Sequence, residues 1–257
     1  MSKYVHPDVK TLRAIADNWW KDPTLNSRKS SRTNTPHDAQ AITRLVSTSS
    51  LAVQDPYSDW VKEFVGWYRY DQKIDLKSMS TAQLEEKLQK YQLDIDYMFF
   101  LSLLTRKVEG PSGSNRLVRI IVMDGIPEDR LSAKYMREET APTIRMWRMS
   151  SKGEQQPFER LLYTLMHEMC HAYFGLFSDQ RHPKHKEWLS DFRGHGEMFW
   201  VLLRFISRKV GVYTKSEEWQ AQLERGEDEC YQTTQTKGEA GSWGTPERTL
   251  MGGVLGP

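Results

Sequence analysis

The sequence predicts an α+β fold, with amphipathic helices around a small β-sheet. Three observations predict it: apolar residues recur at helical spacing in several segments, two short segments between them have strand-type sequence, and a strongly apolar helix follows these strands. The chain has 257 residues, of which 38% are hydrophobic, so it holds enough apolar material for one sizeable core or two small ones. A chain that is disordered throughout is therefore excluded.

Charge and apolar runs exclude further classes of protein. Lys and Arg number 36 against 34 Asp and Glu, so the formal net charge is only +2 and overall basicity does not argue for nucleic acid. The longest apolar run, Tyr97 to Leu104, is far shorter than the roughly 20 residues that cross a bilayer. No secretory signal is visible, and Cys170 and Cys230 make no disulfide framework. We expect no membrane partner and an intracellular location, in the cytoplasm or the nucleus.

The first half of the chain predicts a polar segment and two helices. Residues Lys21 to Gln40 are polar, contain two prolines and offer little to bury, so we expect a mobile linker there. Apolar residues at helical spacing predict an amphipathic helix over Tyr57 to Tyr70. A capping box at Ser80 begins a longer helix, which we expect to run close to Lys107.

The second half predicts two strands and two more helices. The strands cover Arg116 to Met123 and Thr143 to Met149, which are short and rich in strand-forming residues. The helices run from Pro157 to Phe174, with Gly175 as the C-terminal cap, and from Glu197 to Val210. Strand-type sequence therefore stands directly before the most apolar helix.

These elements divide the chain into three parts. Residues 1–56 form an N-terminal polar region with short helices, and residues 57–212 form the main domain. Residues 213–257 are a C-terminal extension, in which we expect a short helix at Trp219 and weak order after Gly226.

The helix over Pro157 to Phe174 contains the pattern His-Glu-x-x-His. His167 and His171 are one turn apart, so their imidazoles lie on one face and can hold one metal ion. Glu168 is offset sideways, where a carboxylate reaches a metal-bound water as general base. Burying these three groups in so apolar a segment is costly without a partner. We therefore favour a metal site over polar side chains that are satisfied by backbone carbonyls.

A catalytic zinc site normally has three protein ligands and an open position, so a third ligand is needed downstream. The metzincin continuation requires Gly and His where this chain has Phe174 and Phe177, which excludes that class. We favour His195, because Gly194 and Gly196 give the backbone freedom on both sides and bring the imidazole to the start of the last apolar helix. The full set of candidates is His182, His185, Glu187, Asp191, His195 and Glu197.

Both motifs together resemble the SprT-like metalloprotease family, whose pattern is HExxH, often followed by Ala-Tyr, and then His-Gly-x-x-Phe. This chain has HEMCHAY from His167 and GHGEMF from Gly194, and the resemblance covers roughly Leu93 to Val210. It implies that Zn²⁺ is held by His167, His171 and His195, that Glu168 is the catalytic base and that Phe199 is a core residue that fixes the third-ligand helix.

The resemblance also implies a fold and a class of substrate. The fold is zincin-like, in which a small sheet precedes the active-site helix and its edge strand aligns the substrate main chain. Thr143 to Met149 is our candidate for that edge. The implied activity is a zinc-dependent endopeptidase that acts on protein substrates, including DNA-associated or crosslinked proteins, with DNA as a further partner, as in Spartan-type members. The 24 positions from His171 to His195 exceed what the family leads us to expect, so Gln180 to Asp191 resembles an insertion beside the site.

Two other functions stay open at this point. One is a non-catalytic zinc-containing module of the same fold that binds protein or DNA, although a pure scaffold has no chemical need for Glu168. The other is a zinc hydrolase that attacks a different bond. Tyr173, Arg193 and His185 are candidates for further oxyanion stabilisation, and we interpret Cys170 as a buried packing residue.

Overall fold

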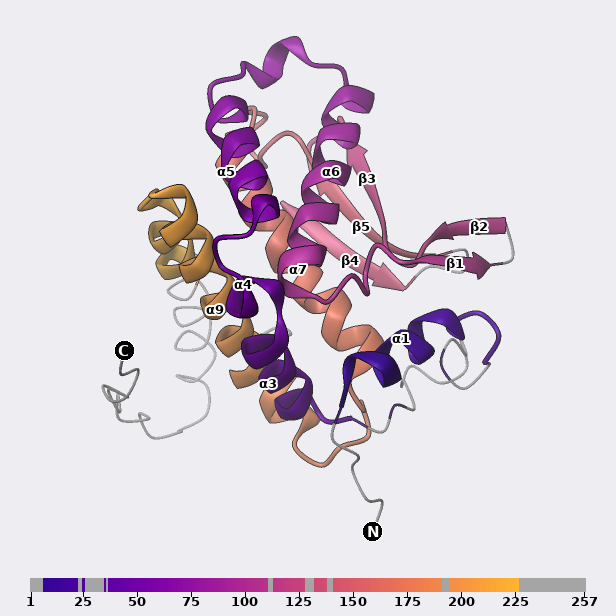
Figure 1. Ribbon diagram of the computed structural model, residues 1–257. Helices are drawn as coiled ribbons and strands as arrows, with labels where there is room; N and C mark the ends of the chain where they lie inside the picture. The colour runs from indigo at the N-terminus through magenta and orange to yellow at the C-terminus, as the bar shows by residue number, and fades with distance from the viewer. Residues whose placement is uncertain are drawn as a thin grey trace, which may run out of the picture.

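Helices and a small sheet surround one long central helix, α7 (Phe158–Phe177) (Figure 1). It packs against strands β4 (Ala133–Arg137) and β5 (Pro142–Trp147) and against helices α6 (Thr81–Phe99) and α9 (Glu197–Thr214). The computed structural model describes residues 7–22, 25, 35, 37–110, 113–127, 132–137, 141–190 and 195–226. The predicted α+β class is confirmed. Within the described residues, no helix combines the length and the apolar character that crossing a membrane requires.

The main sheet has three strands in the order β3 (Arg119–Met123), β5 (Pro142–Trp147) and β4 (Ala133–Arg137). β3 and β5 are parallel, whereas β4 is antiparallel to β5. The two predicted strands are confirmed as β3 and β5, but our choice of Thr143 to Met149 as the edge is wrong. That segment is the central strand, because β4, which the sequence reading missed, pairs with its other side.

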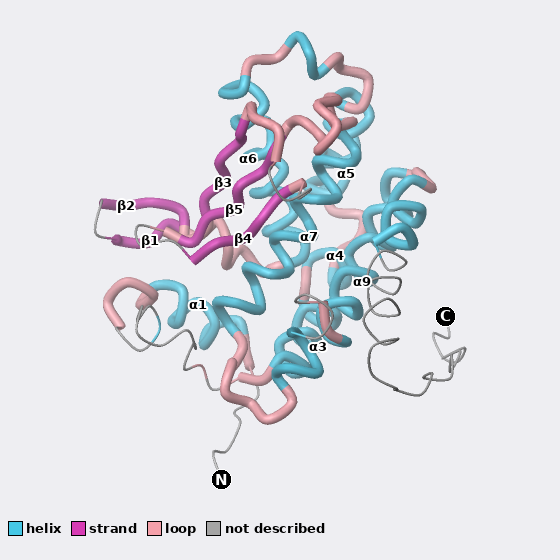
Figure 2. The backbone as a smooth tube through the Cα atoms, turned by 180° about the vertical axis from the view of Figure 1, so that it is seen from behind, coloured by secondary structure: helices cyan, strands magenta, loops and turns pink. Residues whose placement is uncertain are grey.

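A separate hairpin, β1 (Lys107–Gly110) and β2 (Gly113–Arg116), extends away from α9 and lies beside helix α1 (Val9–Asp17) (Figure 2). The ring of Trp20 packs so closely on Gly110 that a Cβ there would lie 3.0 Å from its Nε1. The hairpin begins where we expected a helix to end. Helix α6 (Thr81–Phe99) stops eight positions before Lys107.

The early end of α6 has a local cause in Asp96. Both oxygens of this buried carboxylate accept hydrogen bonds, one from the N–H groups of Leu103 and Leu104 and the other from the N–H and hydroxyl of Thr105. The chain reverses through Leu101 and Ser102, which have positive φ angles of 64° and 58°. A side chain inside the helix thus caps the turn that follows it.

The N-terminal part of the chain folds onto the same core. Helix α1 (Val9–Asp17) buries Leu12 and Ala16, and α3 (Ala39–Ser49) buries Ile42 and Val46. A short helix, α4 (Leu51–Gln54), follows α3. Asp8 and Asp38 cap α1 and α3, because each side chain accepts a hydrogen bond from the backbone N–H of the third residue of its helix.

The linker that we expected over Lys21 to Gln40 is wrong at its C-terminal end. Thr35 is buried and its hydroxyl donates to the carbonyl of Phe177, and the carbonyl of His37, which is also buried, accepts from the N–H of Asp179. These two contacts tie the segment to the end of α7. Residues 23–24, 26–34 and 36 of the expected linker lie outside the described residues.

The remaining helices follow the sequence prediction closely. Helix α5 (Asp59–Asp71) begins after Ser58, whose hydroxyl accepts from the N–H of Val61, and a short 3-10 helix, η1 (Leu76–Ser78), leads to α6. The predicted capping box at Ser80 is present.

The two C-terminal helices are longer than predicted. Helix α7 continues through Gly175 to Phe177, and α9 (Glu197–Thr214) ends four residues after the expected Val210. A short π-helix, η2 (Lys186–Ser190), lies between them. Residues 218–226 are helical and bury Trp219, as predicted, whereas the stretch after Gly226 lies outside the described residues.

Candidate metal centre

Three imidazoles converge where α7 meets the start of α9. The Nε2 atoms lie 3.2 Å apart for His167 and His171, 3.1 Å for His171 and His195, and 2.9 Å for His195 and His167. Among the described residues, this is the cluster of three whose side chains are placed to hold a metal ion. The structure therefore brings together the three histidines that the sequence predicted.

The spacing and chemistry of this triangle fit a zinc ion. Three nitrogen ligands on one tetrahedral ion, each about 2.0–2.1 Å from it, lie about 3.3 Å from one another. The observed separations of 2.9 to 3.2 Å approach that value. An all-imidazole set also suits zinc better than magnesium or calcium, which prefer oxygen ligands.

The backbone explains how the third imidazole reaches the first two. His167 and His171 are four positions apart on α7, whereas His195 precedes Gly196, the N-cap of α9. A Cβ at Gly196 would overlap the backbone of Glu187 and Trp188, so a π-helix over Lys186–Ser190, η2, packs directly on the residue next to His195. The expected insertion therefore buttresses the start of α9.

Phe199 forms the floor of the histidine cluster. Its ring is fully buried and stacks on His171 with centroids 4.4 Å apart at 24°. It meets His167 and His195 edge-on, at 4.9 Å and 4.7 Å. One side chain of α9 thus contacts all three imidazoles, which agrees with the core role that the sequence motif implied for it.

The Glu168 carboxylate lies beside the triangle of histidines and is not one of the three groups placed to bind the metal ion. Its Oε1 is 4.0 Å from Nε2 of His167, and its Oε2 accepts a hydrogen bond of 2.6 Å from the backbone N–H of Tyr135 on β4. Burial raises the pKa of Glu168 to about 7, and the hydrogen bond from Tyr135 opposes that rise. This carboxyl group can therefore exchange a proton near neutral pH.

Burial also sets the charge of the histidines. It lowers the pKa of His171 to about 3, with His195 adding to the effect, and lowers that of His167 well below its usual value. Neutral imidazole is the form that binds a metal ion. The protein thus presents two of the three ring nitrogens as acceptors without competition from protons.

Other candidates from the sequence lie elsewhere. His182 stacks on Trp188 with centroids 4.7 Å apart, and Glu187 and Glu197 are exposed. None of these residues, nor His185, is in the described metal cluster, and Asp191 and Arg193 lie outside the described residues.

Two residues on α7 are turned into the core. Tyr173 is fully buried and its hydroxyl donates to the carbonyl of Ile42. The hydroxyl is therefore not available to stabilise an oxyanion at the histidine cluster, and this candidate was wrong. Cys170 is also fully buried, and burial raises the pKa of its thiol well above the usual value. It is a packing residue, as we predicted.

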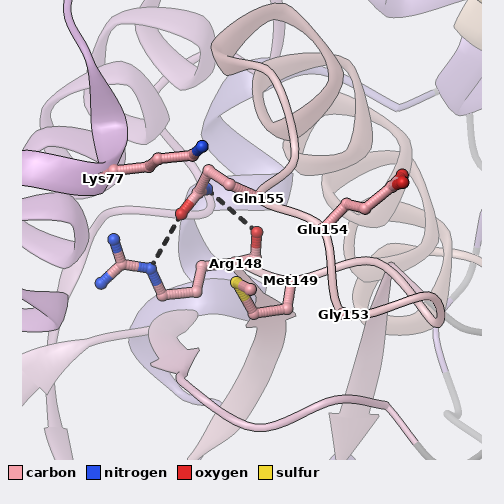
Figure 3. A pocket seen from close by; sticks show the side chains of 6 residues that line it. All are labelled: Lys77, Arg148, Met149, Gly153, Glu154 and Gln155. Carbon is pink, nitrogen blue, oxygen red and sulfur yellow. Dashed lines mark hydrogen bonds between the residues drawn. The ribbon is translucent and has the colours of Figure 1, made fainter.

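An open pocket of about 640 Å³ lies apart from the histidines, at the end of β5 (Figure 3). The guanidinium of Arg148 lines it, but this group donates to Oε1 of Gln155 and to the carbonyls of Leu76 and Met79. Its polar atoms therefore join η1 to the turn after β5, and we assign the pocket no ligand.

Sequence reasoning missed the contribution of Tyr135, because β4 itself was not predicted. In the sequence, β4 is indicated by the alternation of Ala133, Tyr135 and Arg137 toward one face, and the strand contains no β-branched residue.

Comparisons with family models, with curated proteins and with solved structures found no significant match to this chain.

Proposed function

We propose that this chain is a zinc-dependent metalloendopeptidase with a zincin-like core, similar to the SprT-like family. One observation carries the proposal: three Nε2 atoms lie within 3.2 Å of one another, and Oε1 of Glu168 faces them at 4.0 Å from His167. Three convergent imidazoles, of which burial keeps His167 and His171 neutral, and a buried carboxyl group with a pKa of about 7 make up a site for metal-assisted hydrolysis.

His167, His171 and His195 would hold the ion. When bound there, zinc supplies a Lewis acid for a carbonyl oxygen and lowers the pKa of a water toward about 7. Glu168 takes the proton from the attacking water through Oε1 and passes it to the leaving nitrogen as the peptide C–N bond breaks. The water oxygen joins the carbonyl carbon, so an acid and an amine are released.

The outer edge of β4 supports a peptide substrate. β4 is an outermost strand of the three-stranded sheet, and its Tyr135 lies directly beside Glu168. An extended peptide adds to such an edge through main-chain hydrogen bonds, here beside the N–H of Tyr135 that Glu168 already holds. β4 therefore takes the role that we expected of Thr143 to Met149.

We propose proteins as the substrate class, with DNA-associated or crosslinked proteins as one subset. We also propose a location inside the cell. The proposed link to DNA is based on the resemblance of the two motifs. Exposed basic residues of the segment beside the centre, Arg181, Lys184 and Lys186, are compatible with it.

The test is cleavage of an unfolded basic protein by the zinc-loaded chain, with and without single-stranded DNA. Glu168→Gln serves as the blank and Glu197→Gln as the matched control, because Glu197 is exposed on the first turn of α9. We expect wild type and Glu197→Gln to cleave, and Glu168→Gln to bind zinc but lose about 10²- to 10⁴-fold in rate.

Each outcome has a defined meaning. Cleavage only with DNA supports a Spartan-like activity, and cleavage without DNA supports a general protease. Full activity of Glu168→Gln would remove the base from the proposal. A wild-type protein that binds zinc and cleaves nothing would overturn the proposal in favour of a zinc-containing binding module.

A further inference from the structure

We propose that Tyr135 is the positioning residue for Glu168, an inference that rests on the proposed function. The backbone N–H of Tyr135 holds Oε2 of the carboxylate at 2.6 Å, and this leaves Oε1 facing the histidine cluster. With one oxygen tied to β4, the other has a fixed direction. The geometry thus assigns a backbone group of the edge strand to the orientation of the base.

The register of the sheet shows why this N–H is available. In an antiparallel pair, successive residues turn their N–H and C=O groups alternately toward and away from the partner strand. The carbonyl of Ser132 accepts from the N–H of Trp147 on β5. In this register the even-numbered residues of β4 therefore turn their N–H and C=O groups toward β5. Tyr135 is odd-numbered and turns its N–H outward, where Glu168 meets it.

The side chain of the same residue fixes the strand on the helix. A Cβ at Gly175 would lie 2.9 Å from Cε1 of Tyr135, so the ring rests on the backbone of α7. Glu168 and Gly175 are seven positions apart, which is about two helical turns. Tyr135 therefore contacts α7 at two points, through its N–H and through its ring, and both points set the position of β4.

The opposite edge of the sheet provides an internal comparison. There the N–H of Val122 on β3 donates to Oε2 of Glu85 on α6 at 3.0 Å. The other carboxylate oxygen of Glu85 accepts from the side-chain amide of Gln89. The two contacts share the same form, but only that of Glu168 leaves an oxygen facing the three imidazoles.

Two substitutions at Tyr135 isolate the N–H. Tyr135→Pro and Tyr135→Ala both remove the ring, but only proline removes the N–H. Proline is tolerated on an edge strand where the N–H faces away from the ladder, and the preceding Lys134 already has extended backbone. The difference between the two variants therefore reports the hydrogen bond to Glu168.

We expect the Pro variant to have a kcat about 10- to 100-fold below that of the Ala variant, with KM and zinc affinity within about twofold. Zinc affinity is measured by competition with a chromophoric chelator. Glu85→Ala, which breaks the matching contact on β3, is expected to cleave at the wild-type rate.

A second measurement needs no turnover. Hydrogen exchange in dilute solution at single-residue resolution is expected to show the Tyr135 amide exchanging at least about tenfold more slowly in wild type than in Glu168→Ala. Glu85→Ala is expected to speed exchange at Val122 and to leave Tyr135 unchanged.

The outcomes separate the two proposals. Equal kcat values for the Pro and Ala variants, in a chain whose wild type cleaves, overturn the positioning role alone. A Tyr135 amide that exchanges equally fast in wild type and Glu168→Ala does the same, even where the Pro variant does not fold. A wild type that binds zinc without cleaving overturns the proposed function and the positioning role together.

Discussion

Gly196 lies directly against Trp188, so closely that a Cβ at position 196 would overlap the backbone carbonyl carbon of Trp188. Trp188 is nearly fully buried, and the ring of His182 stacks on its indole. Because Gly196 follows His195, the placement of the third imidazole depends on the segment that we first interpreted as an insertion.

Gly196→Ala is therefore expected to destabilise the fold by about 1–3 kcal/mol, the usual cost of overpacking, and to weaken zinc binding at least tenfold. Gly211→Ala is the matched control on the same helix, because a Cβ there meets its nearest atom at an ordinary 3.5 Å. Since alanine favours a helix over glycine, this control is expected to gain about 0.5–1 kcal/mol. Urea unfolding and chelator competition measure both. Unchanged zinc affinity in Gly196→Ala would contradict the coupling.

Zinc is expected to raise the melting temperature. At a free concentration about 1,000 times the Kd, an ion that binds only the folded state adds about 4 kcal/mol of stability, which corresponds to about 8–16 °C for a chain of this size. Scanning calorimetry with zinc and with a chelator measures the shift. His195→Ala is expected to lose most of it, whereas His182→Ala keeps it because His182 stacks on Trp188 away from the cluster. An equal shift in both variants would argue against His195 as a ligand.

Asp94 is expected to lower stability as the pH rises. Burial raises its pKa to about 6; nearby Lys90 opposes the rise and Glu63 of α5 adds to it. An unfolded Asp has a pKa of about 3.9, so the folded state binds the proton more tightly. The stability from this group is full below about pH 4 and is lost as the pH passes 6, by less than about 3 kcal/mol because solvent partly screens the carboxylate.

The check is Asp94→Asn, which cannot ionise. Its free energy of unfolding, relative to wild type, is expected to increase between pH 4 and 6 and then to stay level. A difference that is the same at pH 4 and pH 8 would show that Asp94 is ionised in the fold without cost. Chemical denaturation at each pH supplies the values.

Asp96→Asn is expected to lower the free energy of unfolding at neutral pH, whereas Asp94→Asn is expected to raise it. An asparagine would place an amide NH₂ against one pair of the N–H and hydroxyl donors of Leu103, Leu104 and Thr105. Leaving such buried donors without an acceptor costs about 1–3 kcal/mol. Thermal unfolding measures the loss, and a variant as stable as wild type would show that the turn after α6 does not need this carboxylate.

Asp96 also explains one limit of prediction from sequence. The apolar spacing continues from Leu84 through Leu103, so the pattern alone extends the helix toward Lys107. The helix ends at Phe99 because one buried carboxylate captures three later N–H groups. Helical periodicity carries no information about such a tertiary cap.

Glycine was ambiguous for a similar reason. Gly175 reads as the C-terminal cap of α7, but the helix continues past it, and the residue accommodates the ring of Tyr135 instead. The histidines were predictable because the two on α7 are related by helix geometry alone and the third stands between two glycines. The contact of Glu168 with Tyr135 was not, because it depends on the register of a strand that has no β-branched residue.

Glu85 and Glu168 each accept a hydrogen bond from one N–H of an outer strand of the main sheet, Val122 of β3 and Tyr135 of β4. An N–H of an outer strand that has no acceptor is a point where a strand of another molecule can pair, so each carboxylate limits such pairing at its own position. An inactive form made by truncation, Glu168→Ala, is therefore expected to self-associate with rising concentration, whereas Glu168→Gln keeps an acceptor for the same N–H. When an inactive variant is used to trap a complex, we therefore expect Glu168→Gln to capture substrate and Glu168→Ala to capture a second copy of the chain as well.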